Sequence, residues 1–346
     1  MLCLEKKSGS PTALCTSDYF NWQYRRNPAG QAIIKLAMSS GEEARCVIGQ
    51  YVALPWVIAA QGHKVKVALS VNTLVSSKFR GCGIILPLAR GCFQACHQAG
   101  IDKVIGYPNQ NFHAVATRFL NFTDIAEVPL LIRMLRLSST VRKKFRIKAL
   151  RGPATLLASA GDLLIRAKVP RRGAVSKVEK FDQAYDDLNA CLIRRFPFMV
   201  SRHSAFLNWR YIESPLGYSV LAVRYGGIVA GFLVYRIMDV AGMRCGMIVD
   251  FMLRGDASSP ETGKLLLQAA LYELEERECD IAGALCQLHN IESWMLRRHF
   301  FIKCPDWLKP QPFRFACAPT VTSPAINADF LQGGNWFFAM GDYDAV

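Results

Sequence analysis

The stretch Ser70–Leu88, which reads SVNTLVSSKFRGCGIILPL, decides the fold of the first half of the chain. It begins as a strand that ends near Val75, passes through a short turn containing Arg80, Gly81 and Gly83, and continues as a helix. Free backbone amides at a helix N-terminus attract anions, and glycine lets a phosphate approach the backbone without a clashing Cβ. Because Arg80 adds a fixed positive charge, the turn predicts a diphosphate site. Its spacing matches neither G-x-x-x-x-G-K-[ST] nor G-x-G-x-x-G.

Strands and helices alternate on both sides of this stretch, which predicts an α/β (α+β) layered fold. In the first half, hydrophobic spacing predicts strands at 31–38, 45–54, 64–75 and 103–107 and helices at 83–99 and 112–120. In the second half it predicts strands at 218–223, 228–237, 245–253 and 281–286 and helices at 261–278 and 292–299.

An internal repeat indicates that the two halves are copies of one unit. Asn21-Trp22-Gln23-Tyr24 followed by Asn27-Pro28-Ala29-Gly30 returns, with the same spacing, as Asn208-Trp209-Arg210-Tyr211 followed by Ser214-Pro215-Leu216-Gly217. Self-similarity over so long a period is typical of a duplicated structural unit.

The chain has 346 residues, which also favours two domains, and its net charge of +15 is concentrated between them. Residues 131–180 hold 14 Lys and Arg against 2 Asp and Glu. We therefore expect a first domain at 1–130, a basic amphipathic linker at 131–180 and a second domain at 181–346. Such a linker can be a solvated face, can contact an anionic membrane or can bind nucleic acid, and the last is disfavoured because no nucleic-acid-binding module is recognisable.

Composition also bears on location and on metals. No secretion signal and no apolar run of about 20 residues is visible, so we expect a cytoplasmic protein. The 12 cysteines form no C-x-x-C pair, as expected of reduced thiols. Cys92, Cys96 and His97 lie within about one helical turn, but buried thiols beside a surface histidine are a commoner arrangement than half a metal site, and we expect no metal.

The order of motifs resembles the GNAT (GCN5-related N-acetyltransferase) superfamily. A strand, the R-G-x-G-I turn at 80–84, a helix, a strand ending at Pro108-Asn109, a second helix and Asn121-Phe122 in place of a Gly-Phe pair follow one another. The opening N-W-x-Y motif and the closing W-x-x-x-x-G-D-x-D motif at 336–344 resemble the tandem-domain, FemAB-like bacterial branch. The resemblance implies two tandem GNAT-like domains, each a mixed, mostly antiparallel sheet flanked by helices.

The resemblance also implies a binding site for acetyl-CoA or another acyl-CoA as co-substrate. The turn formed by Arg80, Gly81, Cys82, Gly83 and Ile84 would hold the pyrophosphate. Backbone groups of Thr73, Leu74 and Val75 would pair with the pantetheine arm, and Asn109 and Asn111 would lie near the cofactor.

The sequence departs from the family pattern at several positions. Thr117 stands where a tyrosine often serves as general acid, and Asn72 stands where an acidic residue is common. The second copy has no R-G-x-G turn after Leu253, so we expect it not to bind CoA.

Acyl transfer to an amine needs a proton acceptor for the amine and a proton donor for the thiolate. His113, beside the expected cofactor arm, is the candidate acceptor, and Tyr107 is the candidate donor. Asn72 is a candidate for positioning the substrate, and Asp342 and Asp344 are candidates for attracting a cationic amine. As structural residues, the same side chains would lie at the surface, in a wall or in a solvated turn.

We therefore expect an acyl-CoA-dependent N-acyltransferase acting on a small metabolite, an amino sugar or a lipid-linked saccharide. Two alternatives stay open, a non-catalytic binding or assembly protein with the GNAT fold and a FemAB-like aminoacyl transferase. We also expect peripheral contact between residues 131–180 and the inner face of the membrane, where the basic side chains would meet anionic lipid.

Overall fold

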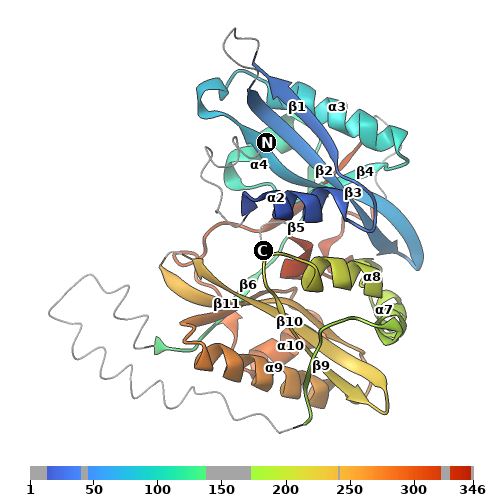
Figure 1. Ribbon diagram of the computed structural model, residues 1–346, viewed down its shortest axis with the longest axis vertical. Coiled ribbons are helices and arrows are strands. Elements are labelled where there is room, and N and C mark those ends of the chain that lie inside the picture. Colours follow the sequence, from blue (N-terminus) through green and yellow to red (C-terminus); the bar gives the residue numbers. More distant parts are fainter. Residues whose placement is uncertain (1–13, 40–45, 138–172, 241, 321–327, 344–346) are drawn as a thin grey trace, which may run out of the picture. The chain divides into compact units, whose positions relative to one another are not determined.

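A computed structural model describes residues 14–39, 46–137, 173–240, 242–320 and 328–343. The chain divides into two units, each built around a seven-stranded sheet (Figure 1). Both units are assembled from separate parts of the sequence. The first comprises 1–128, 196–216 and 311–337, and the second comprises 129–195, 217–310 and 338–346.

The first sheet has the order β1-β2-β3-β4-β14-β5, and a short strand, β8, also pairs with β2. Its long strands β2 and β3 form an antiparallel hairpin, whereas β3 and β4 run parallel. The strand bounds are β1 Ile33–Met38, β2 Val47–Ala60, β3 His63–Val75, β4 Lys103–Gly106, β5 Thr123–Glu127, β8 Phe198–Val200 and β14 Arg314–Pro319.

Two helices of the first unit follow β3 and β4, as hydrophobic spacing predicts. Helix α3 (Ile85–Gln98) packs against β1 and β2 through an apolar face that includes Ala89, Cys92 and Cys96, all fully buried. Helix α4 (Gln110–Phe119) starts at an asparagine cap, because the Asn109 side-chain oxygen accepts the Phe112 N–H at 3.0 Å. Both thiols of α3 are thus core side chains.

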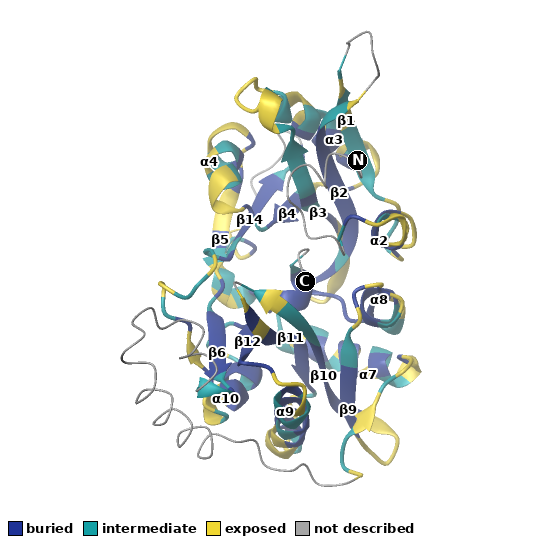
Figure 2. Ribbon diagram, turned by 60° about the vertical axis from the view of Figure 1, so that its left-hand side comes forward, coloured by how far each residue is buried: buried dark blue, intermediate teal, exposed yellow. Residues whose placement is uncertain are grey.

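The second sheet has the order β13-β6-β12-β11-β10-β9-β7 and repeats the same local plan. The strand bounds are β6 Leu130–Met134, β7 Ser176–Lys177, β9 Ser219–Tyr225, β10 Ile228–Val240, β11 Met243–Leu253, β12 Ile281–Leu285 and β13 Ile302–Lys303. The helices are α7 Gln183–Arg195, α9 Ser259–Glu276 and α10 Ile291–Arg298. Strands β2, β10 and β11 are buried over most of their length (Figure 2).

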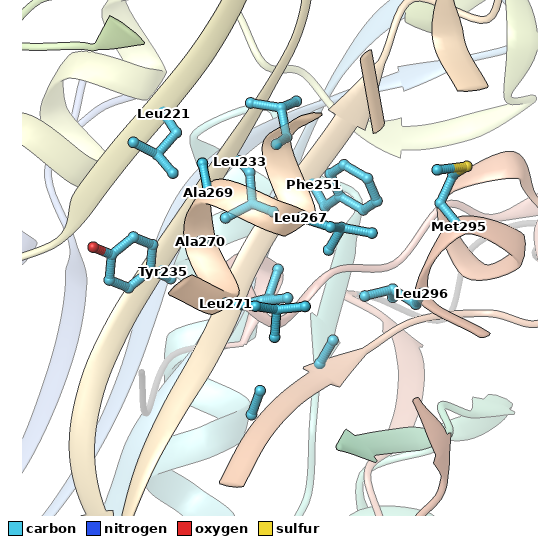
Figure 3. Close-up of a cluster of buried hydrophobic side chains, with 14 of the residues drawn as sticks. Leu221, Leu233, Tyr235, Phe251, Leu267, Ala269, Ala270, Leu271, Met295 and Leu296 are labelled. Atoms are coloured by element: carbon cyan, nitrogen blue, oxygen red, sulfur yellow. The ribbon is translucent and has the colours of Figure 1, made fainter. Parts of the chain in front are cut away.

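The core of the second unit lies between its sheet and helices α9 and α10. Leu267 and Leu271 of α9 pack onto Leu233 and Phe251 of the sheet (Figure 3), and Leu274 belongs to the same buried cluster. Helix α9 approaches β11 so closely at Gly246 that a Cβ there would lie 2.4 Å from Leu274. Burial of this apolar face, more than helix propensity, holds α9 in place.

Two strands belong to a different unit from the one expected from the sequence. Leu130–Met134, expected to lie at the end of the first domain and the start of the linker, forms β6 between β12 and β13 of the second sheet. Arg314–Pro319, expected in the second domain, forms β14 between β4 and β5 of the first. Both strands are largely buried and paired on both sides, and their sequence carries no sign of which sheet they join. Most of the expected basic linker, at 138–172, lies outside the described residues.

The repeated N-W-x-Y segments fold alike. A short helix, α2 Ser17–Phe20, runs into a π-helical turn at Asn21–Arg25, and α8 Ser204–Leu207 runs into a π-helical turn at Asn208–Ile212. Both segments belong to the first unit, and Trp22 and Trp209 stack there with ring centroids 5.2 Å apart. Each indole N–H donates to the other residue's carbonyl, at 2.6 and 2.9 Å. The two copies of the motif therefore form a symmetrical, buried contact within the first unit.

None of the helices in the described ranges is long and apolar enough to cross a membrane.

We predict that Trp22→Phe and Trp209→Phe each lower the free energy of unfolding by about 1–3 kcal/mol, because each leaves a buried carbonyl without its donor. The double variant should lose less than the sum of the two, since both side chains form one contact. Urea unfolding measures all three.

Trp56→Phe is the matched control. Trp56 is buried in the same unit, and its indole N–H has no hydrogen-bond partner among the described residues. An equal loss in Trp56→Phe would show that indole size, and not the reciprocal hydrogen bonds, accounts for the effect.

Candidate functional site

Strands β3 and β4 separate at the carboxyl end of β4. Their parallel pairing runs from Ala68 opposite Val104 to Ser70 opposite Gly106, where β4 ends. Strand β3 continues to Val75, paired only with β2. Since the Ser76 N–H donates to Ile48 of β2, the backbone groups of Val75 point the other way, toward the side that β4 has left. The Val75 N–H thus faces an open strand edge, and the Val75 carbonyl accepts a long hydrogen bond, 3.4 Å, from the Arg80 Nε.

A bulge at Asn72 allows this separation. The register between β2 and β3 shifts there, and Asn72 has φ +48°, a conformation that asparagine tolerates better than most residues. Its side-chain amide donates to the Tyr24 hydroxyl at 2.5 Å and to Gln23 at 3.2 Å, and its carbonyl accepts from Gln50 at 3.0 Å. The candidate substrate-positioning residue Asn72 therefore has its amide committed to shaping the strand.

The turn after β3 leads directly into α3. Gly81 and Gly83 have φ +83° and +73°, and a Cβ on either would meet no atom within 4 Å. Ile84 at the N-cap of α3 supplies no side-chain hydrogen bond, so no side chain caps the first amides of the helix. The Leu86 N–H donates to the Gly83 carbonyl at 3.2 Å and Pro87, the third residue of the helix, has no N–H, so the amides of Ile84 and Ile85 are the donors left at the helix start.

The open strand edge, the glycine turn and the start of α3 border one cleft of about 550 Å³. Helix α4 supplies the remaining lining. The cleft is lined by Thr73, Leu74, Val75, Phe79, Arg80, Gly81, Gly83, Ile84, Ile85, Asn109, Asn111, Phe112 and Val115. The structure thus brings together the residues expected to bind a cofactor, apart from Cys82, which is exposed and is not part of the lining.

Four apolar residues of this lining were not anticipated from the sequence, namely Phe79, Ile85, Phe112 and Val115. A signal for part of this wall was present. Phe112 and Val115 are three residues apart on the helix predicted at 112–120, so they share one face.

The charge among the described residues that line the cleft is positive. Arg80 is its charged side chain, and its Nε donates a hydrogen bond of 3.4 Å to the Val75 carbonyl oxygen. No Asp, Glu, His, Cys or Tyr is among the described residues that line the cleft. The arrangement can hold an anion at the helix start and an amide-bearing chain along Val75, but the lining contains no group for acid–base catalysis.

The two candidates for proton transfer lie outside the lining. His113 is on α4, and its Nε2 is 2.9 Å from a carboxylate oxygen of Asp124 on β5. Tyr107 directly follows β4, where the strands separate, and its ring packs against Phe315 of β14 with centroids 5.1 Å apart.

The candidates for attracting an amine belong to the second unit. Asp342 is 4% exposed, and its carboxylate accepts the Ala339 N–H at 2.9 Å at the start of a 3₁₀ turn, Met340–Asp342. This carboxylate stabilises a buried turn. Asp344 lies outside the described residues. No cluster of three or more His, Cys, Asp or Glu side chains able to hold a metal occurs within the described ranges.

The second unit contains a counterpart of the open edge. Leu253 ends β11 opposite Gly231, as Val75 ends β3 opposite Gly49. Asn290 caps α10 as Asn109 caps α4, so Glu292 takes the helical position of Asn111.

In the second unit, two side chains fill this edge. The Leu253 N–H donates to Glu292 at 3.2 Å, and the Leu253 carbonyl accepts from Arg195. Arg195 also donates to both carboxylate oxygens of Glu292, at 3.1 and 3.2 Å. Burial raises the pKa of Glu292, while Arg195 and the Leu253 amide oppose that rise. Both carbonyls thus accept from an arginine, but the Leu253 N–H is taken by Glu292, whereas the Val75 N–H has no partner among the described residues.

Solved structures with a similar fold are acyltransferases by name. N-myristoyltransferase of Saccharomyces cerevisiae with bound myristoyl-CoA superposes with a TM-score of 0.61 and 13% identity over 88% of this chain and 74% of that one. A GCN5-related N-acetyltransferase from Anabaena variabilis gives a TM-score of 0.57 and 11% identity over 92% and 69%. No protein-family model matches the chain, and no curated protein sequence matches it.

The fold is therefore the tandem GNAT-like fold, as the sequence predicts, with two mixed sheets flanked by helices. At these identities the likeness concerns the fold.

We predict that Arg195→Met lowers the free energy of unfolding by about 3–5 kcal/mol, because Glu292 is left buried without its counter-ion. Arg195→Met with Glu292→Gln should recover most of that loss, since glutamine is neutral and still accepts the Leu253 N–H. Urea unfolding of the full chain measures both.

Lys264→Met is the control, because Lys264 and Glu261 form an ion pair with both side chains at least half exposed. Its loss should stay below about 1 kcal/mol. Similar losses in Arg195→Met and Lys264→Met would contradict the assignment of Arg195 and Glu292 as a buried closure.

Proposed function

We propose that the first unit binds an acyl-CoA in the cleft beside Val75 and that the protein transfers the acyl group to an amine. The proposal rests on one observation. A single cleft contains both the strand edge at Val75 and the start of α3, which has no side-chain cap and lies beside Arg80. These two features suit the two ends of one ligand, an amide-bearing arm and a diphosphate. The acyltransferase names of the structural neighbours support the same assignment.

Binding uses backbone groups more than side chains. The amides of Ile84 and Ile85 at the start of α3 and the Arg80 guanidinium hold the diphosphate, and Gly81 and Gly83 leave room for it. The N–H and carbonyl of Val75 pair with the pantetheine amides as a neighbouring strand would. The second unit supports this assignment, because Glu292 and Arg195 supply an acceptor and a donor at the matching residue, Leu253. We infer one acyl-CoA site per chain.

The reaction joins the amine nitrogen to the acyl carbon, breaks the carbon–sulfur bond and leaves CoA as a thiol. Tyr107 is the proposed donor of the thiol proton, because it follows β4 where the strands separate. His113, paired with Asp124, stays the proposed acceptor of the amine proton from outside the cleft lining. Because Asn72 shapes the bulge, we propose that it positions the strand and not the substrate.

The acceptor stays open among a small metabolite, an amino sugar and a lipid-linked saccharide, and Asp344 remains a proposed contact for its amine. The FemAB-like branch, with an aminoacyl donor, and a cytoplasmic, bacterial setting with membrane contact through 131–180 also remain proposals. A second candidate function is a non-catalytic acyl-CoA-binding protein. It is favoured by the lack of any acid–base group among the described lining residues.

We predict that isothermal titration detects acetyl-CoA binding to the full chain. Arg80→Ala should weaken it about 10- to 100-fold, because a charge-assisted contact to phosphate is lost. Gly83→Ala should weaken it as well, since its methyl would occupy the phosphate space.

Both variants have matched controls. Arg90 is an exposed residue of α3 away from the cleft lining, and Gly100 has φ +74° with open space around its Cβ position. Arg90→Ala and Gly100→Ala should therefore bind like the wild type. No binding by the wild type, or equal affinities for Arg80→Ala and Arg90→Ala, would refute the site.

A thiol-release assay across amine acceptors separates the enzyme from the non-catalytic alternative. We expect Tyr107→Phe to lower kcat by about 100-fold or more with acetyl-CoA binding unchanged, and His113→Gln to lower it less. Binding of acetyl-CoA without thiol release for any acceptor would favour the non-catalytic function. A larger loss of kcat in His113→Gln than in Tyr107→Phe would make His113 the more important group for proton transfer.

A further inference from the structure

Exposed apolar side chains gather on one short stretch of the second unit. Trp294, Phe300, Ile302 and Trp307 are 39%, 77%, 60% and 81% exposed. They account for four of the nine large apolar residues that are exposed in the described part of the chain. We call residues 294–309 the aromatic face. Clustered exposure of large side chains marks an interaction site more often than scattered exposure does.

The backbone of the aromatic face supports a functional reason for this exposure. Phe300 has φ +62°, which is strained for a bulky residue. Asn121, which takes the same place after α4 in the first unit, has φ +56° and bears that conformation more easily. Phe301, between the exposed Phe300 and Ile302, is 2% exposed and is a core residue of the second unit. Phe300 is therefore a solvent-exposed phenylalanine in a backbone conformation that asparagine adopts more easily.

Positive charge surrounds these side chains. Arg297, Arg298, Lys303 and Lys309 accompany them, with Asp306 as the acidic residue of the stretch. The Arg298 guanidinium lies over the Trp294 ring, 4.7 Å from its centroid. Within the described ranges, Arg297, Arg298 and Lys303 form no ion pair with an acidic side chain. The aromatic face thus joins exposed aromatic rings to a net positive charge.

The strand that pairs with the aromatic face leads into a basic stretch of the sequence. Ile302 and Lys303 form β13, the edge strand of the second sheet, which pairs with β6. The chain leaves β6 toward residues 138–172, whose sequence holds ten Lys and Arg and one Asp. The most basic segment of the chain is thus attached to the strand beside the aromatic face.

We propose that the aromatic face docks on the interface of an anionic lipid bilayer. Tryptophan and phenylalanine rings suit the boundary between headgroups and acyl chains, and basic side chains attract anionic headgroups. A second copy of the chain is disfavoured, because a symmetric contact would place the same cations against one another. The proposal is independent of the proposed acyl transfer.

Vesicle sedimentation of the full chain tests the docking, with phosphatidylcholine vesicles with and without phosphatidylglycerol. The wild type should sediment with the anionic vesicles. Phe300→Asn with Trp307→Gln should lower the partition coefficient about tenfold or more, because the buried apolar area is lost. Asparagine at position 300 also relieves the backbone strain, so this variant should fold.

Tyr225→Gln with Ile228→Gln is the matched control, since both residues are exposed apolar side chains of the same unit, 44% and 55% exposed, outside the aromatic face. This variant should sediment like the wild type. Arg297→Gln with Arg298→Gln should weaken binding to anionic vesicles, and added salt should weaken binding by the wild type.

Three results would overturn the proposal. The first is a wild type that sediments with neither kind of vesicle. The second is undiminished sedimentation of the Phe300→Asn, Trp307→Gln variant, which would assign lipid binding to 131–180. The third is a wild type that binds no lipid but dimerises on size exclusion, with the dimer lost in that variant, which would assign the aromatic face to a second copy.

Discussion

Two backbone groups of Val75 impose the constraint on which the rest of the site depends. Strand β4 ends at Gly106 while β3 continues, and the bulge at Asn72 turns the last residues of β3 away from any strand on that side. The Val75 carbonyl accepts from Arg80, while its N–H faces the cleft and is free to donate to a ligand. At Val75 the edge opens onto a cleft whose other end is the start of α3.

In the second unit, side chains of the protein itself complete the matching strand edge at Leu253. Arg195 and Glu292 complete the backbone of Leu253, at the cost of burying the Glu292 carboxylate beside a partly buried arginine. Such a pair is stable only when both partners are present and hydrogen-bonded, which makes it a permanent closure. The duplicated fold has thus kept one open edge and filled the other. This contrast supports our proposal that the first unit binds the acyl donor and the second does not.

Most of the fold could be predicted from the sequence, because the elements are local and strongly patterned. The strands and helices around both copies of the repeat lie where periodicity places them, and the R-G-x-G turn precedes a helix as expected. Most of the expected cofactor residues line one cleft, because they lie within two short segments that follow neighbouring parallel strands. The contacts of Asn72 could not be predicted, because its partner Tyr24 lies 48 positions away, whereas the contact of Asp342 with the Ala339 N–H is local and has the spacing of a helix cap.

The sequence by itself determined the duplication, the order of elements and the position of the glycine turn, since each depends on residues close together in the chain. Only the tertiary structure decided which sheet receives β6 and β14, because pairing between distant strands leaves no local signature. It also decided that Arg195 closes the edge at Leu253, since that contact joins residues 58 positions apart. Long-range partners of buried polar groups are chosen by packing, and a single sequence does not display them.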